Sequence, residues 1–350
     1  MQKKHMEASK KLPAEWEKQS FLQFTFPHEK SDWAYLLDQV TACFVELIET
    51  TAKFQDVLVV CDNVERVKSF FDSAQNIFFV QAESNDTWAR DHGGITVLEN
   101  EKAVIHDYIF NGWGNKFDAG LDNQITKKLN EKGIFENCII KTFELVLEGG
   151  SLESDGKGTI LTTSECLLSK NRNEHLSKQQ IEELLKENFG AKRILWLNHG
   201  YLAGDDTDSH IDTLARFCDE KTIAFVGCDN AEDEHFEELQ QMKKELQQFT
   251  DVHGNHYQLV ELPLPDACFD EDGNRLPATY VNFTIINGAV LVPVYGVLQD
   301  QKALRILQNC FPDRKIIGVN CRVLIEQHGS LHCVTMQYPE QVKLNKEILD

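Results

Sequence analysis

A cysteine near the end of the chain is the first candidate for chemistry. Cys333 follows His332 and a Gly329-Ser330 turn, and an apolar-polar alternation comes after it. A thiol is a good nucleophile near neutral pH only when a nearby cation or hydrogen-bonding partner lowers its pKa. Since most lone cysteines in proteins are small buried hydrophobic residues, the interpretation of Cys333 as a nucleophile depends on the motifs that accompany it.

The second motif is His210-Ile211-Asp212. We interpret it as an extended segment, in which His210 and Asp212 point to one face and Ile211 points away. An imidazole beside a carboxylate can act as a proton shuttle. Asp206 belongs to an acidic run just before this motif. For that run a solvated loop or a calcium site is the alternative, although the spacing of an EF-hand is not met.

Further carboxylates and aromatic residues occur in loops or at strand ends. Carboxylates can each grip the planar N–H fork of a guanidinium, and an indole face suits a delocalised cation. The candidates for such contacts are Asp86, Trp88, Arg90, Asp91, Trp113, Glu148 and Asn282. Arg90 is either a ligand or the structural partner of one of the acids, and Asn282 is either a core amide or an amide that faces the site. Together these motifs predict a nucleophilic site for a cationic substrate.

Composition narrows the classes of protein to consider. The chain has 350 residues, a formal net charge of −21, and 42% apolar and 26% charged residues, as in ordinary globular proteins. The negative charge argues against nucleic acid as a partner, because phosphate binding requires clustered Lys and Arg. The N-terminus lacks the apolar core of a signal peptide, and the apolar stretch 285–298 is too interrupted to span a membrane. The ten cysteines are scattered without a Cys-x-x-Cys pair, so we expect no metal cluster, free thiols and a cytoplasmic location.

The pattern of apolar residues predicts alternating helices and strands in a single domain. Helices are predicted at 32–54, 64–71, 120–132, 177–188, 231–249 and 299–310. Strands are predicted at 57–61, 77–81, 94–98, 103–108, 143–147, 159–162, 194–197, 222–226, 258–261, 280–286, 289–294, 315–319 and 333–337. No linker-like segment divides residues 1–350, and residues 1–12 are expected to form a loose extension.

The order of these elements indicates a structural repeat. A strand, a glycine-containing turn, a second strand, a helix and a further strand recur about every 50–70 residues. The equivalent turns are expected at 91–94, 148–151, 198–204, 286–288 and 327–330. A doubly wound sheet is the alternative, but no Gly-x-Gly-x-x-Gly fingerprint is present.

Seven ordered motifs give the sequence a specific resemblance. They are Asn-Asp-Thr-Trp-Ala-Arg-Asp at 85–91, Phe-Asn-Gly-Trp-Gly-Asn-Lys-Phe at 110–117, Leu-Glu-Gly-Gly-Ser at 147–151, the segment 161–173, Thr-Asp-Ser-His-Ile-Asp at 207–212, Tyr-Val-Asn-Phe at 280–283 and Gly-Ser-Leu-His-Cys-Val-Thr at 329–335. In these motifs the chain resembles agmatine deiminases and the wider bacterial peptidylarginine-deiminase-type family of guanidine-modifying enzymes. The resemblance covers residues 12–340.

The resemblance implies a fold and roles for the candidate residues. The fold would be an α/β five-bladed propeller (pentein) with pseudo-fivefold symmetry, built from ββαβ-type units. Cys333 would be the nucleophile and His210 the general acid/base. The other positions that match the family are the acids Asp91, Asp212 and Glu148 around the guanidinium, and the pocket residues Trp88, Trp113 and Asn282. Ser209 stands where the family more often has glycine before the histidine.

The reaction that the resemblance implies is hydrolysis without a metal or organic cofactor. A small cationic guanidino compound, most specifically agmatine, would be converted to N-carbamoylputrescine and ammonia through a covalent amidino-thioether on Cys333. The family resemblance also implies a homodimer. Four alternatives stay open: a deiminase of another guanidino compound or of peptidylarginine, an amidinotransferase, a non-catalytic protein that binds polyamines or metal, and a structural protein in which Cys333 is merely buried.

Overall fold

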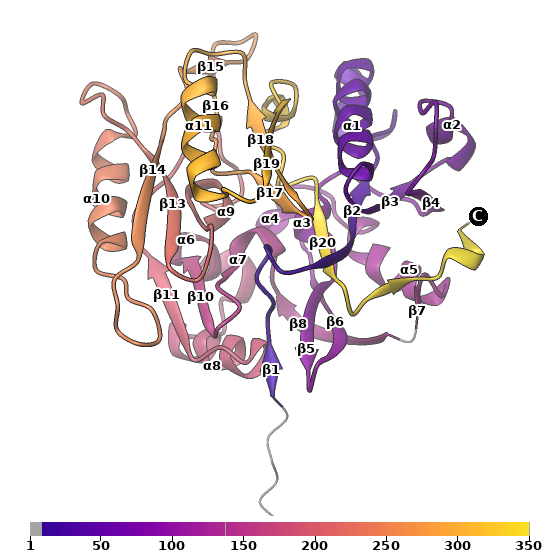
Figure 1. Ribbon diagram of the computed structural model, residues 1–350, viewed down its shortest axis with the longest axis horizontal. Helices are drawn as coiled ribbons and strands as arrows, with labels where there is room; N and C mark the ends of the chain where they lie inside the picture. Colours follow the sequence, from indigo (N-terminus) through magenta and orange to yellow (C-terminus); the bar gives the residue numbers. More distant parts are fainter. Residues whose placement is uncertain (1–8, 137, 350) are drawn as a thin grey trace, which may run out of the picture.

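The computed structural model describes residues 9–136 and 138–349. The longer helices lie around the outside of the molecule, and most strands lie closer to its middle (Figure 1). In this described part, no helix combines the length and the apolar character that crossing a membrane requires.

Five sheets of three or four strands share one construction. In each sheet a central strand pairs antiparallel with a strand on one side and parallel with a strand on the other. In the first sheet the antiparallel, central and parallel strands are β20 Met336–Pro339, β2 Gln19–Thr25 and β3 Asp56–Cys61, and in the second they are β5 Ile95–Glu99, β6 Lys102–Ile109 and β8 Ile139–Val146. In the third sheet, in the same order, they are β9 Glu153–Ser154, β10 Thr159–Thr163 and β11 Arg193–Leu197. In the fourth they are β12 Ala215–Phe217, β13 Thr222–Gly227 and β14 Gln258–Pro263, and in the fifth β17 Thr284–Ile286, β18 Ala289–Val294 and β19 Lys315–Asn320.

Each parallel pair is joined by a helix, as parallel strands require a long crossover connection. These crossover helices are α1 Leu37–Ala52, α5 Ile125–Glu131, α8 Lys178–Phe189, α10 Phe236–Leu246 and α11 Asp300–Cys310. The shorter helices are α2 Val64–Lys68, α3 Ala89–His92, α4 Gly112–Asn115, α6 Ser164–Leu167, α7 Lys170–Asn173 and α9 Ile211–Leu214. Single 3-10 turns are η1 Asp32–Leu36, η2 Asp122–Gln124, η3 Gly149–Ser151, η4 Leu324–Gln327 and η5 Lys346–Ile348.

The remaining strands lie at edges. β4 Ile77–Gln81 pairs with β3, and β1 Lys10–Lys11 pairs with β5. Two further short pairs are β7 Phe135–Glu136 with β21 Lys343–Leu344, and β15 Cys268–Phe269 with β16 Arg275–Leu276. The described folded chain is therefore an α/β protein of repeated sheet units.

The first sheet is completed from the other end of the chain. β20, drawn yellow in Figure 1, lies beside the indigo β2, and the two strands pair antiparallel. Without β20 the first sheet would lack the antiparallel strand that each of the other four units has. This pairing holds the segment that carries Cys333 against the N-terminal part of the protein.

Helix α8 illustrates how local sequence sets these elements. The Ser177 hydroxyl accepts from the backbone N–H of Gln180, and the Gln180 side chain accepts from the backbone N–H of Ser177, an arrangement known as a capping box. Ile181 and Leu185 lie one turn apart on the buried face. The helix ends at Gly190, whose φ of 68° is left-handed, a conformation that glycine adopts without a steric penalty.

The structure differs from the predicted elements at several places. The strand β2 was not predicted, because Gln19 and Gln23 interrupt its apolar pattern although both are buried. The strand predicted at 280–286 begins only at Thr284, and the strand predicted at 333–337 begins at Met336. The segments just before these two strands bond to each other instead, because the backbone N–H of His332 donates to the carbonyl of Asn282.

Two other expectations are wrong. The segment of His210 and Asp212 is not extended: His210 caps the short helix α9, which begins at Ile211. The described part of the extension expected at 1–12 is not loose, because β1 pairs with β5 and the N–H of Leu12 donates to the carbonyl of Phe189. Residues 1–8 lie outside the described residues.

The turns that carry the site residues occupy one equivalent place in the repeat. Each lies directly before the antiparallel strand of its sheet: α3 before β5, η3 before β9, α9 before β12, the segment 279–283 before β17 and the segment 331–335 before β20. Three of the five turns expected from the sequence are close to these places. The turns expected at 198–204 and 286–288 are not, since the equivalent positions are 210–214 and 279–283.

Candidate active site

Cys333 lies in a buried pocket made mainly by carboxylates and aromatic rings. The space within the pocket and its open mouth amounts to about 370 Å³. Its lining residues are Asp32, Asp86, Trp88, Asp91, Trp113, Phe117, Asp206, Thr207, Gln327, His328, Gly329 and Cys333. This set contains four carboxyl groups and no Lys or Arg, so the pocket offers acceptors to a cation and holds no competing lysine or arginine charge.

The thiol of Cys333 is held in an electronegative environment. Its Sγ lies 3.5 Å from the amide oxygen of Asn282, to which the thiol donates. Burial, followed by the charges of Asp212 and Asp91, raises the pKa of Cys333 well above its ordinary value. The thiol of the empty site is therefore protonated at neutral pH, and a cation placed among these carboxylates would favour the thiolate.

Asp91 and His210 are brought together by two close turns. The His210 Nδ1 lies 3.6 Å from Asp91 Oδ1, which also accepts a 3.0 Å hydrogen bond from the N–H of Gly150. Burial lowers the pKa of His210 to about 3, so its ring is neutral, and its Nε2 has no hydrogen-bond partner among the described residues. A neutral imidazole with a free nitrogen can accept a proton.

The pKa values of the two aspartates of the site are shifted in opposite directions. Burial, followed by the charge of Asp212, raises the pKa of Asp91 well above its ordinary value. Burial alone would raise the pKa of Asp212 too, but the hydrogen bond and charge of His332 lower it below its ordinary value. One oxygen of Asp212 accepts from His332 at 2.7 Å, and its other oxygen, Oδ1, is buried without a hydrogen-bond partner within 9–136 and 138–349.

Trp113 supplies the second hydrogen bond to Asp91. Its indole N–H donates to Asp91 Oδ2 at 2.9 Å. Trp113 has a φ of 53°, left-handed backbone that costs a non-glycine residue about 1–3 kcal/mol. Gly112 and Gly114 on either side also have positive φ, and the strained turn aims the indole at the carboxylate.

Glu148 does not face the pocket as a free carboxylate. Both of its oxygens accept from the Nε of Arg172, at 2.9 and 3.0 Å, and both side chains are fully buried. Burial raises the pKa of Glu148, and Arg172 acts in the opposite direction. No role for Arg172 was predicted from the sequence. Its place in the segment 161–173 was the one available signal of this ion pair.

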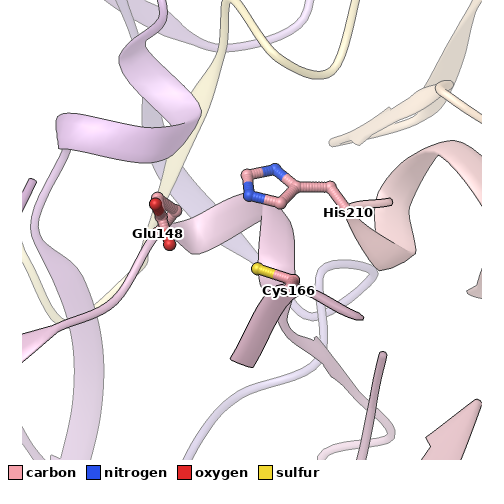
Figure 2. Close-up of side chains that lie close together, drawn as sticks. All are labelled: Glu148, Cys166 and His210. Atoms are coloured by element: carbon pink, nitrogen blue, oxygen red, sulfur yellow. The ribbon is translucent and has the colours of Figure 1, made fainter. Parts of the chain in front are cut away.

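Glu148 also approaches His210 and a second thiol. Figure 2 shows the His210 ring pointing toward Glu148, with the thiol of Cys166 beside the ring. One donor atom of each residue lies within 4.8 Å of the others, as a metal site would need. Since Arg172 already occupies the Glu148 carboxylate with a positive charge, this donor set does not favour a divalent ion.

Asn282 links three elements of the site. Its amide nitrogen donates to the carbonyl of Asp212 at 3.1 Å, and its oxygen accepts from the backbone of His332 at 2.8 Å. Asn282 is thus a fully buried amide with both ends hydrogen-bonded, and its oxygen is also the partner of the Cys333 thiol.

The remaining predicted residues separate into two groups. Asp86 and Asp206 line the pocket, and Trp88 donates from its indole to Asp86 at 2.9 Å. Arg90 does not line it. Its Nη1 donates to Gln337 at 2.6 Å, its Nη2 lies 3.8 Å from Glu15, and the side chain lines a different cavity, so the geometry does not support Arg90 as a substrate contact. Its partners are also not the site acids that the structural alternative named.

Glu15 and His332 are the buried residues near the site that sequence reasoning missed. His332 was named only as the neighbour of Cys333, and Glu15 lies just beyond the segment expected to be loose. The His332 ring contacts both Glu15 and Asp212. Only the adjacency of His332 to Cys333 could have suggested a role from the sequence.

The geometry is that of a buried cysteine site for a small cation on an α/β scaffold. Comparison with known proteins identifies the family. A profile of the Porphyromonas-type peptidyl-arginine deiminase family matches residues 11–339. The agmatine deiminase of Stutzerimonas stutzeri (strain A1501) is 32% identical, over 94% of this chain and 95% of that protein. The agmatine deiminase of Medicago truncatula is 30% identical, over 94% of this chain and 96% of that protein.

A solved structure supports the same family relationship. A Cys-to-Ser variant of the C. jejuni agmatine deiminase with substrate bound is 42% identical, with a TM-score of 0.89 over 94% of this chain and 96% of that chain. The chain belongs to the Porphyromonas-type peptidyl-arginine deiminase family.

Gly150 gives a first prediction. A Cβ at this position would lie 2.6 Å from His210 Nδ1 and 2.8 Å from Asp91 Oδ1, closer than such atoms can approach. Gly150→Ala should therefore displace both side chains and lower kcat/KM for the substrate by about 100-fold, the size expected for a misplacement of about 1 Å. Steady-state kinetics on folded protein would measure the loss.

Gly120→Ala is the matched control, because a Cβ there would meet only Asp118 Oδ1 at 3.6 Å. Full activity of Gly150→Ala would contradict the close approach described for these turns.

Proposed function

We propose that the protein is an agmatine deiminase, which hydrolyses agmatine to N-carbamoylputrescine and ammonia. The observation that carries the proposal is a buried thiol in a pocket lined by four carboxylates and by no Lys or Arg. Agmatine carries a guanidinium at one end and an ammonium at the other. The family membership and the agmatine deiminases among the relatives support the same substrate.

The position of the carboxylates favours a substrate with two positive charges. Asp91 lies beside Cys333, where the guanidinium would bind, and Asp86 and Asp206 line the same pocket and are available to a distal ammonium. Arginine and peptidylarginine carry a carboxylate or an amide near this end of the molecule. A carboxylate there would need a cationic partner, and the lining residues include no Lys or Arg.

The first half of the reaction forms a covalent intermediate. The guanidinium binds between Asp91 and Asp212, and its positive charge offsets the carboxylates that hold the Cys333 thiol protonated. His210 accepts the thiol proton, and the thiolate attacks the central guanidinium carbon. The C–N bond to a terminal nitrogen breaks, His210 returns the proton to that nitrogen, ammonia leaves, and a cationic amidino-thioether remains on Cys333.

The second half releases the product. His210 accepts a proton from water, and the resulting hydroxide adds to the amidino carbon. The C–S bond then breaks, the thiol is restored with one proton, and the other proton leaves with ammonia as ammonium. The sum is guanidinium plus water to urea plus ammonium, with the distal ammonium of the substrate unchanged.

The remaining assignments follow from the same interpretation. We propose that Glu148 acts through its ion pair with Arg172, and that Trp88 and Trp113 form the aromatic walls of the pocket. We also propose that the five sheets are the blades of a five-bladed propeller. All ten cysteines lie in the described residues and are unpaired, which supports a cytoplasmic location.

The test of the function is ammonia release from agmatine, arginine and an internal arginine peptide under identical conditions. Release should be rapid from agmatine, slower by at least about tenfold in kcat/KM from the other two, and abolished by Cys333→Ala. The half-buried thiol of Cys138 is outside the pocket, so Cys138→Ala is the control that should keep full activity. Turnover by Cys333→Ala, or a preference for the peptide, would contradict the proposal.

Asp206 gives a prediction on pH dependence. Burial, followed by the charge of Asp205, raises the pKa of Asp206 to about 6, while His328 and Lys116 act in the opposite direction. Below this pH the carboxyl is neutral and above it the carboxylate attracts a cation. The KM for agmatine should therefore fall as the pH rises through about 6.

Asp206→Asn should flatten this pH dependence and raise the KM for agmatine at pH 7.5 by up to about tenfold, or about 1.4 kcal/mol. Butylguanidine, which lacks the distal ammonium, should show no such change. Asp118→Asn removes the same charge from an exposed position outside the pocket and serves as control. An equal rise in KM for both substrates would place Asp206 away from the distal ammonium.

A further inference from the structure

A chain of buried charged groups leads from the pocket to the N-terminal part of the protein. His332 Nδ1 lies 2.7 Å from Asp212 Oδ2, and His332 Nε2 lies 2.7 Å from Glu15 Oε2. All three side chains are buried, and Glu15 comes from the segment just before β2. A residue more than 300 positions away in sequence thus reaches the partner of a site carboxylate.

The His332 ring places one nitrogen against each of two carboxyl groups. Ionised carboxylates can only accept hydrogen bonds, so each ring nitrogen that bonds to one must carry a hydrogen. With both Asp212 and Glu15 ionised, His332 is an imidazolium between two carboxylates. Such charge-assisted hydrogen bonds are stronger than neutral ones, and burial increases their strength further.

Glu15 is itself held in the ionised form. Its Oε2 also accepts from Arg216 Nη2 at 2.6 Å, and its Oε1 accepts from the backbone N–H of Ile285 at 2.6 Å. Burial alone would raise the pKa of Glu15, but Arg216 and His332 lower it well below its ordinary value. Arg216 bonds in addition to Glu153, which does not bond to His332.

The chain of contacts distinguishes the two aspartates of the site. Asp212 has a cationic neighbour and one unpartnered oxygen, whereas the partners of Asp91 are the neutral N–H groups of Gly150 and Trp113. The carboxylate that is already ionised in the empty site is therefore Asp212. Its free oxygen is the one prepared to accept from a guanidinium.

We propose that Glu15 and His332 are positioning residues, which keep Asp212 ionised and orient its free oxygen toward the guanidinium. The proposal rests on the proposed function in one respect, that a guanidinium is the ligand of Asp212. Neither residue needs to touch the substrate. Their effect reaches the reaction through the charge state of Asp212.

Other charged groups face these residues and act on the same equilibrium. Around Asp212 and His332 they are Arg90, Asp91, Glu153, His210, Arg216 and Cys333. Since Glu15 and Glu153 share Arg216 but only Glu15 contacts His332, replacing each in turn separates the effect of His332 from that of Arg216.

The experiment compares the pH profiles of kcat/KM in three proteins: the unmodified enzyme, Glu15→Gln and Glu153→Gln. The substrate is butylguanidine, which lacks the distal ammonium, so that the titration of Asp206 near pH 6 does not set the acid limb. Binding requires ionised Asp212, so kcat/KM falls on the acid side as Asp212 becomes protonated. Glu15→Gln removes the charge that stabilises the His332 cation and thereby raises the pKa of Asp212. The acid limb should move to higher pH by about one unit, a loss of about tenfold at a pH on that limb.

Glu153→Gln should leave the acid limb in place. Equal shifts in the two variants, or no shift in Glu15→Gln, would overturn the proposal. If Glu15→Gln does not fold, His332→Gln replaces it, because its amide can still donate to Asp212 but carries no charge. It should show a shift at least as large, and an unshifted limb would overturn the proposal.

A second measurement is independent of activity. Nitrogen-15 NMR of the histidine rings, with His332→Gln to assign the signal, reports how many ring nitrogens are protonated. At pH 7.5 both nitrogens of His332 should be protonated in the unmodified enzyme, and one should be in Glu15→Gln. A neutral His332 in the unmodified enzyme would overturn the proposal even if agmatine is the substrate. Inactivity toward every guanidine with a doubly protonated His332 would instead refute the proposed function alone.

Discussion

The structure is organised around the neutralisation of buried carboxylates. Taking a charged group out of water is costly unless an opposite charge and hydrogen bonds accompany it. Glu148 is paired with Arg172, Asp212 with His332, and the pair Glu15 and Glu153 with Arg216. Asp91, beside Cys333, instead has hydrogen bonds from neutral N–H groups, those of Trp113 and Gly150. The missing positive charge is the feature that makes the pocket selective for a cation.

The fold brings these groups together through repetition. Each of the five sheets contains a short antiparallel strand, and the turn before that strand carries a site residue in every case: Asp91, Glu148, Asp212, Asn282 and Cys333. Residues that are 50 to more than 200 positions apart in sequence therefore converge without any long functional loop. The pairing of β20 with β2 completes the set, because it fixes the last turn against the first sheet.

The sequence predicted most of the helices and the strands with clear apolar patterns, and its motifs pointed to the residues around the thiol. The sequence-based prediction failed where polar residues are buried or an element is very short. The strand β2 contains two buried glutamines, and the helix α9 is a single turn, too short to show a period. Glu15, Arg172 and Arg216 could not be placed, because an ion pair between distant positions leaves no local pattern. Arg90 was misassigned for the same reason, since its partner Gln337 is 247 positions away.

The same balance of charges ties the reactivity of the thiol to the presence of the substrate. In the empty site burial, followed by the charges of Asp212 and Asp91, raises the pKa of Cys333, so the thiol is a poor nucleophile toward any neutral electrophile that enters. A guanidinium between the two aspartates reverses that electrostatic effect at the place where attack occurs. The carboxylates that bind the substrate are thus also the groups that suppress the nucleophile in its absence. A site with a permanent lysine or arginine beside Cys333 would have a more reactive thiol but would repel the cation that it has to bind.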